Sequence, residues 1–479
     1  MAEPPKSPDM PPEEFRQWGR RFVDWIADYL SHPERYPVLS QAEPGATRRR
    51  LAAGPPLRGE PLEEMLRDID NVIVPGITHW NHPGFFAYFA VTGSGPGILG
   101  ELLSAAFNVN GMTWQTSPSF TELEELVLDW LRQMLGLPAD FKGVVYDTAS
   151  TSTFHALVAA REAITERDVG EHGIAGPDAP RLRMYTSSQA HSSVEKAAMA
   201  IGIGRRGLAK VAVDARFQMD PLALESAIRK DLSEGWRPFC VSATIGATST
   251  TSVDPVPPIA EICKRYNLWL HVDAAYAGAA AILPEIRWVL DGVEQADSFV
   301  MNPHKWLFTP IDFSAFYCRR PDVLKRAFSL TREYLETPGG ESVTNYMDYG
   351  IQLGRRFRSL KFWMVVRYFG VEGLQTRIRE HIRLGKLFAS WVEAHPRFEV
   401  VAPVPFSTVC FRLKADDAAN QNLIDRVNAS GKIFLSHTRL NDKLTIRFSV
   451  GNLRSTQEHV RMAWDLIEKA SKEGSQETG

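Results

Sequence analysis

The sequence predicts an α/β fold with a mostly parallel central sheet. Short apolar runs, too brief for helices, begin near residues 143, 182, 209, 239, 268 and 297, and helical patterns separate them. Strands that alternate with helices in this way form parallel sheets whose faces the helices cover. The chain has 479 residues, which is enough for a large core and more than one domain. After residue 375 we expect a smaller α+β unit with strands over 398–402, 408–413 and 444–450.

The composition excludes several classes of protein. Lys and Arg number 54 against 57 Asp and Glu, so the charge balance indicates no nucleic-acid partner. The four cysteines are far apart and form no C-x-x-C pair, which favours free thiols over disulfides or a zinc site. No apolar run approaches the ~18 residues of a membrane span, and the first residues lack a signal-like apolar stretch. We therefore expect a cytoplasmic protein without a membrane partner.

The N-terminal residues predict two helices. Large side chains recur at helical spacing, which gives the first helix an aromatic stripe: Phe15, Trp18, Phe22, Ile26 and Tyr29. A second helix is expected over residues 61–73. His79 and His82 have an H-x-x-H spacing, but no third candidate ligand lies nearby, so we expect no metal site.

The next segments predict a phosphate-binding turn. A helix is expected to begin with a capping box at Thr121 to Glu124. The strand over residues 143–146 leads into a run of small and hydroxyl residues at 147–152, and a helix to residue 164 follows. Backbone N–H groups and the helix dipole at such a turn can bind a phosphate.

One glycine motif has the wrong context for a dinucleotide site. Residues 202–207 read G-x-G-x-x-G, but a dinucleotide fingerprint follows a strand and opens a helix. Here the motif follows the helix expected over 194–200 and precedes the strand over 209–213. We therefore interpret it as a helix terminus and turn.

The chain is organised around residues 268–306. A buried strand ends at Asp273, and a second short strand leads into Asn302, His304 and Lys305. Ligands of α/β proteins gather at the carboxyl ends of parallel strands, so we expect Asp273 and Lys305 to share a site. The two could form a simple ion pair. A carboxylate behind a pyridine nitrogen and a lysine that forms a Schiff base are also the two requirements for holding pyridoxal phosphate.

The motifs themselves favour the cofactor. His-Val-Asp-Ala-Ala-Tyr-Ala-Gly at 271–278 and Asn-Pro-His-Lys-Trp at 302–306 resemble the group II pyridoxal-phosphate decarboxylases, and among them the aromatic L-amino-acid decarboxylases. The resemblance covers residues 10–470 and implies a fold-type I enzyme. It implies three parts: an N-terminal helical segment that packs on a partner subunit (1–84), a large cofactor-binding α/β domain (85–374) and a small C-terminal α+β domain (375–479).

The resemblance also assigns residue roles. It implies four catalytic residues: Lys305 as the Schiff-base lysine, Asp273 behind the pyridine nitrogen, His191 stacked on the ring and Tyr334 as a proton donor. Tyr334 lies in a polar loop, residues 331–345, that we expect to be a lid. For Arg447 a surface ion pair and a site-facing role both stay open. The cofactor would contact Ala149, Ser150, His191, Thr248, Asp273, Ala275, Asn302, His304 and Lys305.

The substrate side chain is expected to contact Trp80, Phe89, Val91, Met112 and Gly354. Relatives usually have Pro and then Thr or Ser after the Tyr-Phe pair, whereas this chain has Ala90 and Val91. Val91 cannot hydrogen-bond a ring hydroxyl, and Gly354 resembles indole-accepting relatives. Both features favour tryptophan or phenylalanine over dihydroxyphenylalanine.

Competing functions remain. A glutamate decarboxylase would need polar groups in place of Trp80, Phe85, Phe86 and Phe89. In related aldehyde synthases the lid tyrosine is replaced by phenylalanine or the stacking histidine by asparagine, whereas this chain keeps Tyr334 and His191. An aminotransferase would use a keto-acid acceptor, and a cofactor-free scaffold would not need Lys305. The aromatic N-terminal helix and the resemblance together predict a homodimer with its active site at the subunit interface.

Overall fold

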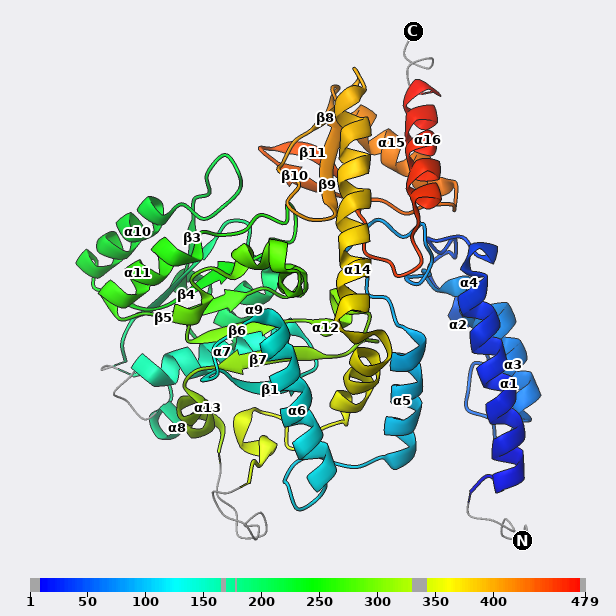
Figure 1. Ribbon diagram of the computed structural model, residues 1–479, viewed down its shortest axis with the longest axis horizontal. Helices are drawn as coiled ribbons and strands as arrows, with labels where there is room; N and C mark the ends of the chain where they lie inside the picture. The colour runs from blue at the N-terminus through cyan, green and yellow to red at the C-terminus, as the bar shows by residue number, and fades with distance from the viewer. Residues whose placement is uncertain (1–8, 165–168, 177–178, 330–342, 474–479) are drawn as a thin grey trace.

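The computed structural model describes residues 9–164, 169–176, 179–329 and 343–473 (Figure 1). A seven-stranded sheet has the order β1-β7-β6-β5-β4-β2-β3. β7 is antiparallel to β1 and β6, and all other pairs are parallel, so the predicted mostly parallel α/β sheet is confirmed. The strands are β1 (Lys142–Tyr146), β2 (Leu182–Ser187), β3 (Leu208–Val211), β4 (Arg237–Thr244), β5 (Trp269–Asp273), β6 (Ser298–Met301) and β7 (Ser314–Cys318).

Helices cover both faces of this sheet. One face packs on α7, α9 and α13. The strand residues that point to the opposite face, such as Leu270, pack on α6, α10 and α11. Strands buried on both faces explain why they read as continuous apolar runs. The helices of this part are α5 (Gly95–Phe107), α6 (Pro118–Leu135), α7 (Ala149–Ile164), α8 (Val169–His172), α9 (Ser192–Ala200), α10 (Pro221–Ser233), α11 (Val256–Tyr266), α12 (Pro303–Trp306) and α13 (Pro321–Phe328).

The N-terminal helices form an arm beside α5 (Figure 1). Helix α1 (Pro12–Ser31) confirms the first predicted helix, and none of its residues is buried. The short helix α2 (Ala46–Arg50) comes next. Helix α3 (Leu62–Asp68) follows and continues through a π-helical turn, Ile69–Ile73, into α4 (Val74–Gly76), where the second helix is predicted. Arg21 pairs with Glu63, and Trp25 Nε1 donates to Asp70 at 2.7 Å, so polar contacts join α1 to this second helix.

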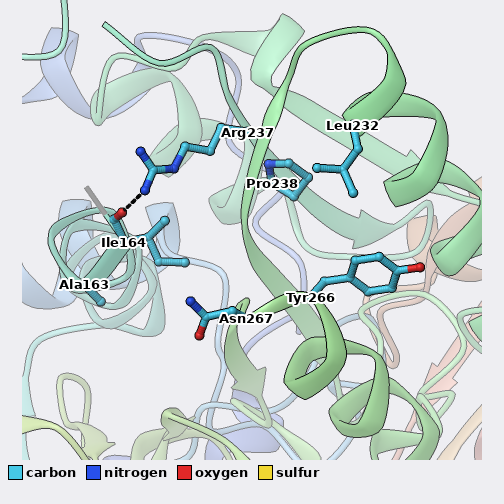
Figure 2. Close-up of a pocket in the computed structure, with 7 residues that line it drawn as sticks. All are labelled: Ala163, Ile164, Leu232, Arg237, Pro238, Tyr266 and Asn267. Carbon is cyan, nitrogen blue, oxygen red and sulfur yellow. Dashed lines mark hydrogen bonds between the residues drawn. The ribbon is translucent and has the colours of Figure 1, made fainter. Parts of the chain in front are cut away.

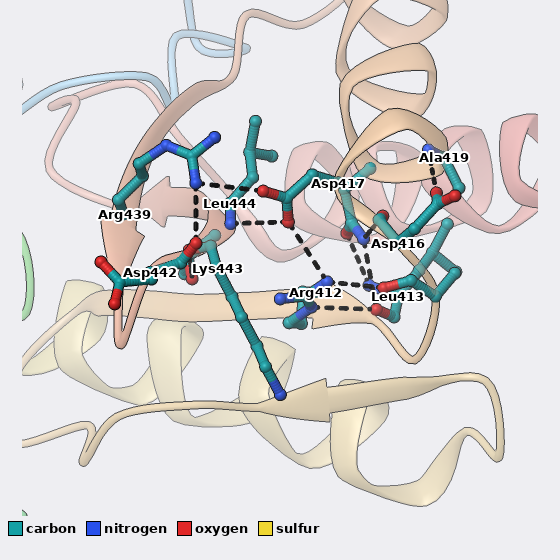
Figure 3. A network of polar contacts seen from close by, with 12 residues as sticks. Arg412, Leu413, Asp416, Asp417, Ala419, Arg439, Asp442, Lys443 and Leu444 are labelled. Atoms are coloured by element: carbon teal, nitrogen blue, oxygen red, sulfur yellow. Dashed lines mark hydrogen bonds and ion pairs between the residues drawn. The ribbon is translucent and has the colours of Figure 1, made fainter.

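The C-terminal part contains an antiparallel sheet of order β10-β11-β9-β8. The three predicted strands are found as β8 (Phe398–Val400), β9 (Thr408–Leu413) and β11 (Lys443–Ser449), with α15 (Asp417–Ala429) and α16 (Gln457–Glu473) beside them. Sequence reasoning missed β10 (Ser436–Leu440), an edge strand whose central residues are mostly polar and exposed. Asp417 joins these elements, accepting from Leu444 N at 2.9 Å and pairing with Arg439 at 3.1 Å and Arg412 at 3.6 Å (Figure 3).

Helix α14 (Arg358–Ala394) connects the two sheets. Its helical backbone is interrupted at Gly370, with φ 64° and ψ 168°. A positive φ of this kind favours glycine. The helix spans the boundary expected at residue 375, and the division into three parts stays a prediction.

Two sequence interpretations have clear outcomes. The capping box is wrong: α6 begins three residues earlier at Pro118, and both Thr121 and Glu124 are buried inside it. Glu124 instead accepts from Val145 N at 2.9 Å and pairs with the buried Arg355 at 2.6 Å. The reading of the glycine motif as a turn is confirmed, because α9 ends before it and Gly202 and Gly204 have φ of 86° and 67°.

All four cysteines are buried free thiols, as the sequence predicts. Among the described residues, no helix has the length and apolar character needed to cross a bilayer.

Candidate active site

The structure brings Asp273 and Lys305 together at one edge of the sheet. Asp273 ends β5, and Lys305 lies in α12, directly after the neighbouring parallel strand β6. Ala275 N donates to Asp273 Oδ1 at 3.0 Å, and Asn302 N donates to Ala275 O at 3.0 Å. Lys305 N then donates to Asn302 O at 2.9 Å. Short backbone hydrogen bonds therefore hold the acid and the lysine in one unit.

The environment prepares Lys305 for nucleophilic chemistry. Burial lowers the pKa of Lys305, and the carboxylate of Asp273 opposes part of that shift. A lysine whose amine is more easily deprotonated is a better nucleophile toward a carbonyl group. The same two groups act on His191, because Lys305 lowers and Asp273 raises its pKa. These three predicted catalytic residues therefore share one electrostatic environment.

His191 is held as a neutral donor. It is the N-cap residue of α9, where its Nδ1 accepts from Ser193 N at 3.2 Å and lies 2.8 Å from Ser193 Oγ. Partial burial and Lys305 lower the pKa of His191, so the ring is uncharged at neutral pH. Since Nδ1 accepts the backbone N–H, the ring proton is placed on Nε2.

An aromatic stack lies under the lysine. Lys305 Nζ is 5.5 Å from the ring centroid of Phe89, which stacks on Tyr276 with centroids 3.7 Å apart. Tyr276 in turn stacks on Trp306 at 4.7 Å. Phe89 is a predicted substrate contact, whereas Tyr276 has no predicted role although it lies inside the 271–278 motif. The stack gives the lysine a rigid apolar support.

Arg447 lies against the same ring, so a surface ion pair is the wrong interpretation of this residue. Only 4% of Arg447 is exposed, and its guanidinium lies 5.2 Å from the Phe89 centroid. Its Nε donates to Ser249 O at 3.1 Å, and its Nη2 has no partner among the described residues. A buried guanidinium with a free N–H can bind a carboxylate. The signal in the sequence is an arginine between the apolar residues Ile446 and Phe448 of a buried strand.

The N-terminus of α7 reaches the same edge of the sheet. Ala149 is the first residue of α7, and Ser150 is exposed beside it. Ser152 Oγ lies 2.8 Å from Ser314 Oγ, at the start of the antiparallel strand β7, which lies at the edge where β5 and β6 end. Free N–H groups at this helix start are suited to a phosphate.

Two further predicted cofactor contacts have distinct environments. Thr248 is exposed in the turn after β4, next to Ser249, whose carbonyl accepts from Arg447. His304 is buried beside Lys305, and its Nδ1 accepts from Phe313 N at 2.9 Å. Burial lowers the pKa of His304 to about 3, so this ring is neutral.

The predicted substrate residues do not all gather at Lys305. Trp80 is 38% exposed and packs on Phe85, with centroids 4.4 Å apart, and Val91 is half-buried. Met112 and Gly354 lie on two segments that hydrogen bonds join: Gly111 N to Arg355 O at 3.1 Å, Arg355 N to Asn110 Oδ1 at 2.9 Å and Met347 N to Met112 O at 3.0 Å. Within the described residues, no hydrogen bond or ring contact links these segments to Lys305.

Two sequence features fall elsewhere. His79 Nδ1 is 2.9 Å from Tyr29 OH, and His82 Nδ1 accepts from Gly84 N at 2.9 Å, so both histidines have structural partners. Across the described residues, no three metal-binding side chains gather in one place. Tyr334 and residues 331–342 of the expected lid lie outside the described residues.

A separate cavity of 430 Å³ lies where strand β4 begins, at the end of the parallel strands opposite to Asp273 (Figure 2). Its lining includes Arg237, the first residue of β4, whose Nη2 donates to Ile164 O at 2.5 Å. Asp273 ends the parallel strand β5, so this cavity is distant from the lysine along the strand direction.

Residues 44–414 match the family profile described as "Pyridoxal-dependent decarboxylase conserved domain". The chain belongs to this family. Its cofactor is pyridoxal phosphate, and the chain is an enzyme of the aromatic-L-amino-acid decarboxylase type within the pyridoxal-dependent decarboxylases.

Similar proteins of this family are named for different activities. Tryptophan decarboxylase 2 of Oryza sativa subsp. japonica is 43% identical over 96% of this chain and 94% of its own length. Tyrosine decarboxylase 4 of Petroselinum crispum is 43% identical, covering 95% and 93%. Phenylacetaldehyde synthase of Arabidopsis thaliana is 41% identical, covering 96% of each chain. The relatives therefore establish the aromatic class without selecting one substrate.

Solved structures agree with this fold. The Oryza sativa TDC structure with PLP and tryptamine has a TM-score of 0.94 and 39% identity, covering 98% of this chain and 99% of that one. The side chains described above also fit the cofactor of the pyridoxal-dependent decarboxylases. Lys305 has a lowered pKa beside Asp273, and the first turn of α7 directs backbone N–H groups toward the same end of the strands. Together they supply an amine, a carboxylate and phosphate donors.

Proposed function

We propose that this enzyme decarboxylates aromatic L-amino acids to the arylalkylamine and carbon dioxide, with tryptophan or phenylalanine preferred over dihydroxyphenylalanine. The observation that carries the proposal is Lys305, which lies beside Asp273 and above the Phe89–Tyr276 stack. Bound pyridoxal phosphate supplies an electron sink for the negative charge that decarboxylation leaves on Cα. The test is to incubate the loaded enzyme with mixed amino acids and to identify the amine by mass spectrometry.

Each residue has a task in this proposal. Lys305 binds the cofactor covalently, and Asp273 keeps the pyridine nitrogen protonated through its negative charge. His191 packs on the ring and donates through Nε2 to the substrate end. These groups act on charge that develops only as the C–C bond breaks, where stabilisation accelerates the reaction most. The phosphate is held by Ala149, Ser150 and Asn302, while Thr248, Ala275 and His304 complete the cofactor contacts.

The pocket wall determines the expected substrate order. Val91 presents no hydrogen-bond partner to a ring hydroxyl, and an apolar wall favours the unsubstituted ring. We expect kcat/KM to be higher for tryptophan than for dihydroxyphenylalanine. In Val91→Thr we expect the ratio of kcat/KM for tryptophan to kcat/KM for dihydroxyphenylalanine to fall about tenfold, because the threonine hydroxyl can form one hydrogen bond with a ring hydroxyl. Steady-state kinetics of both purified proteins measure this ratio, and Val91→Ala is the control for lost volume. A parent enzyme that prefers dihydroxyphenylalanine would contradict the prediction.

Tyr334 separates a decarboxylase from an aldehyde synthase. A proton must reach Cα after carbon dioxide leaves, and we assign its delivery to the Tyr334 hydroxyl. For Tyr334→Phe we expect amine formation to fall about 10²-fold and aldehyde and peroxide to appear in oxygenated buffer. Product analysis by mass spectrometry with a peroxide assay measures both. A variant that forms amine at the parent rate without aldehyde would show that Tyr334 has another role.

Other candidates are less well supported. A glutamate decarboxylase would need a cationic or polar group for each of two substrate carboxylates, whereas Arg447 is the one described cation besides Lys305 against the Phe89 ring. An aminotransferase would release a keto acid in the presence of an acceptor, and a direct assay with a keto-acid acceptor would detect it.

We also propose a homodimer with its active site at the subunit interface. Helix α5 exposes a continuous apolar face, and α1 has no buried residue, so both need a covering surface. Met112 and Gly354, expected at the substrate ring, lie on segments without a described contact to Lys305 of the same chain. A partner subunit could supply them. The exposed apolar residues of α5 are Leu99, Leu102, Leu103 and Phe107.

Mixed dimers test this arrangement. Lys305→Ala removes the reactive amine, and Gly354→Trp fills the space expected for the substrate ring. Gly354 is exposed, and a Cβ added there would lie no closer than 3.7 Å to Asn110 Nδ2, so a larger side chain is tolerated within one chain. If the two residues come from different subunits, every heterodimer keeps one intact site of two, and heterodimers make up half of all dimers in an equal mixture. We expect co-refolded equal mixtures to recover about a quarter of the parent activity. Mixtures without activity, or a monomeric mass of 53.7 kDa by sedimentation, would contradict the shared site.

A further inference from the structure

A cluster of buried polar side chains lies directly behind Asp273. Ser242 of β4, His271 of β5 and Ser298 of β6 are cross-strand neighbours, and all three are fully buried. Thr244 is the corresponding neighbour of Asp273, two residues further along both strands. Residues two apart in a strand lie on the same face, so these side chains share the face that packs on α7.

Three atoms of this cluster lack a partner among the described residues. They are Ser242 Oγ, Thr244 Oγ1 and His271 Nε2. Buried polar atoms are nearly always hydrogen-bonded, and those without a protein partner usually bind an ordered water. Positions 242, 244, 271 and 273 outline a rectangle of about 4.8 Å by 6.6 Å, from the strand spacing and the rise of two residues. Polar side chains that leave one face of the sheet this close together can share a buried water, which typically makes about three hydrogen bonds.

Ser298 provides the described hydrogen-bond partner of the His271 ring. Trp269 Nε1 can only donate, and it donates to Ser298 Oγ at 2.9 Å. The Ser298 hydroxyl proton is then free for His271 Nδ1, 2.9 Å away. Burial lowers the pKa of His271 to about 4, so the ring is neutral near pH 7. When Nδ1 accepts from the Ser298 hydroxyl, the single ring proton is on Nε2, the nitrogen without a described partner.

We propose that His271 is a positioning residue for Asp273 and acts through a buried water. The water accepts from His271 Nε2–H, contacts the hydroxyls of Ser242 and Thr244, and donates to the Asp273 carboxylate. In the described chain the one hydrogen bond to the Asp273 side chain comes from Ala275 N, so a second donor stabilises the ionised form. The inference rests on the proposed role of Asp273 toward the cofactor nitrogen.

The consequence is a carboxylate held in one orientation within a site where only 5% of Asp273 is exposed. Loss of one hydrogen bond to a charged group corresponds to about a tenfold to hundredfold change in an equilibrium constant. We expect this loss to appear in the affinity for pyridoxal phosphate and in the visible absorption band of the loaded enzyme. A purely structural role would change thermal stability without changing the band.

Conservative variants of the water ligands test the inference. Thr244→Val keeps the side-chain shape and removes the hydroxyl, and Thr445→Val makes the same change at a buried threonine of the small sheet. We expect the dissociation constant of the cofactor to rise about tenfold in Thr244→Val and in His271→Phe, with a weaker visible band. His271→Gln, which keeps an N–H donor, should recover part of the loss, while Thr445→Val should stay within about twofold of the parent.

A crystal structure of the loaded enzyme supplies the direct observation. We expect ordered water density within hydrogen-bond distance of His271 Nε2 and Asp273. Absence of this water, or Thr244→Val and His271→Phe that behave like Thr445→Val, would overturn the inference. Asp273→Asn separates the inference about His271 from the proposed role of Asp273. If Asp273→Asn changes cofactor affinity and the visible band while the other variants do not, only the water-mediated role of His271 is wrong. If it changes neither, the role proposed for Asp273 fails as well.

Discussion

Replacing Lys305 with alanine is expected to lower kcat at least about 10⁴-fold and to abolish the visible absorption band of the enzyme. The amine of Lys305 is the group that binds the cofactor covalently in the proposed site, and its lowered pKa makes it reactive. Carbon dioxide release and absorption spectroscopy of the reconstituted protein measure the two effects. Phe89 and Asp273 stay in place in this variant, so the loss reports the amine alone.

Two controls make the Lys305 result specific. Lys305→Arg keeps a positive charge but forms no stable covalent link to the cofactor, so we expect it to be as inactive as the alanine variant. Lys210→Ala removes an exposed lysine that pairs with Glu195 at 2.9 Å, and we expect unchanged turnover. Residual activity of Lys305→Ala above about a tenth of the parent rate would show that another group binds the cofactor.

Asp273→Asn is expected to reduce kcat by about 10²- to 10³-fold while the protein stays folded. The amide has nearly the shape of the carboxylate but no charge, so it cannot keep the pyridine nitrogen protonated. Asp273 Oδ1 accepts from Ala275 N, and an asparagine oxygen can replace it there, which preserves the turn. Steady-state decarboxylation and thermal unfolding of the same preparation measure activity and stability together.

Asp231 provides the matched control. It is also buried, pairs with Arg183 at 2.9 Å and accepts from Tyr185 OH at 2.9 Å, on a different part of the sheet. For Asp231→Asn we expect a lower unfolding temperature with kcat within about threefold of the parent. If both variants lose activity in proportion to stability, Asp273 acts as a structural residue.

Local patterns determined much of the fold. Strands buried on both faces produce continuous apolar runs, so the strands of the large sheet could be predicted from the chain alone. The polar edge strand β10 could not, because few of its side chains contact a core. The start of α6 was also misplaced, since Thr121 and Glu124 resemble a capping box although the fold buries both.

The sequence by itself determined the fold class, the two strand ends that carry Asp273 and Lys305, and the family motifs around them, because these depend on residues near one another in the chain. The tertiary structure decided which distant residues join them. Arg447 lies 142 positions after Lys305 in the sequence, yet both cations lie against the Phe89 ring. His271 gained its significance only when β4 and β6 placed Ser242 and Ser298 beside it. Partners of this kind come from strand pairing and helix packing, which short-range sequence patterns do not encode.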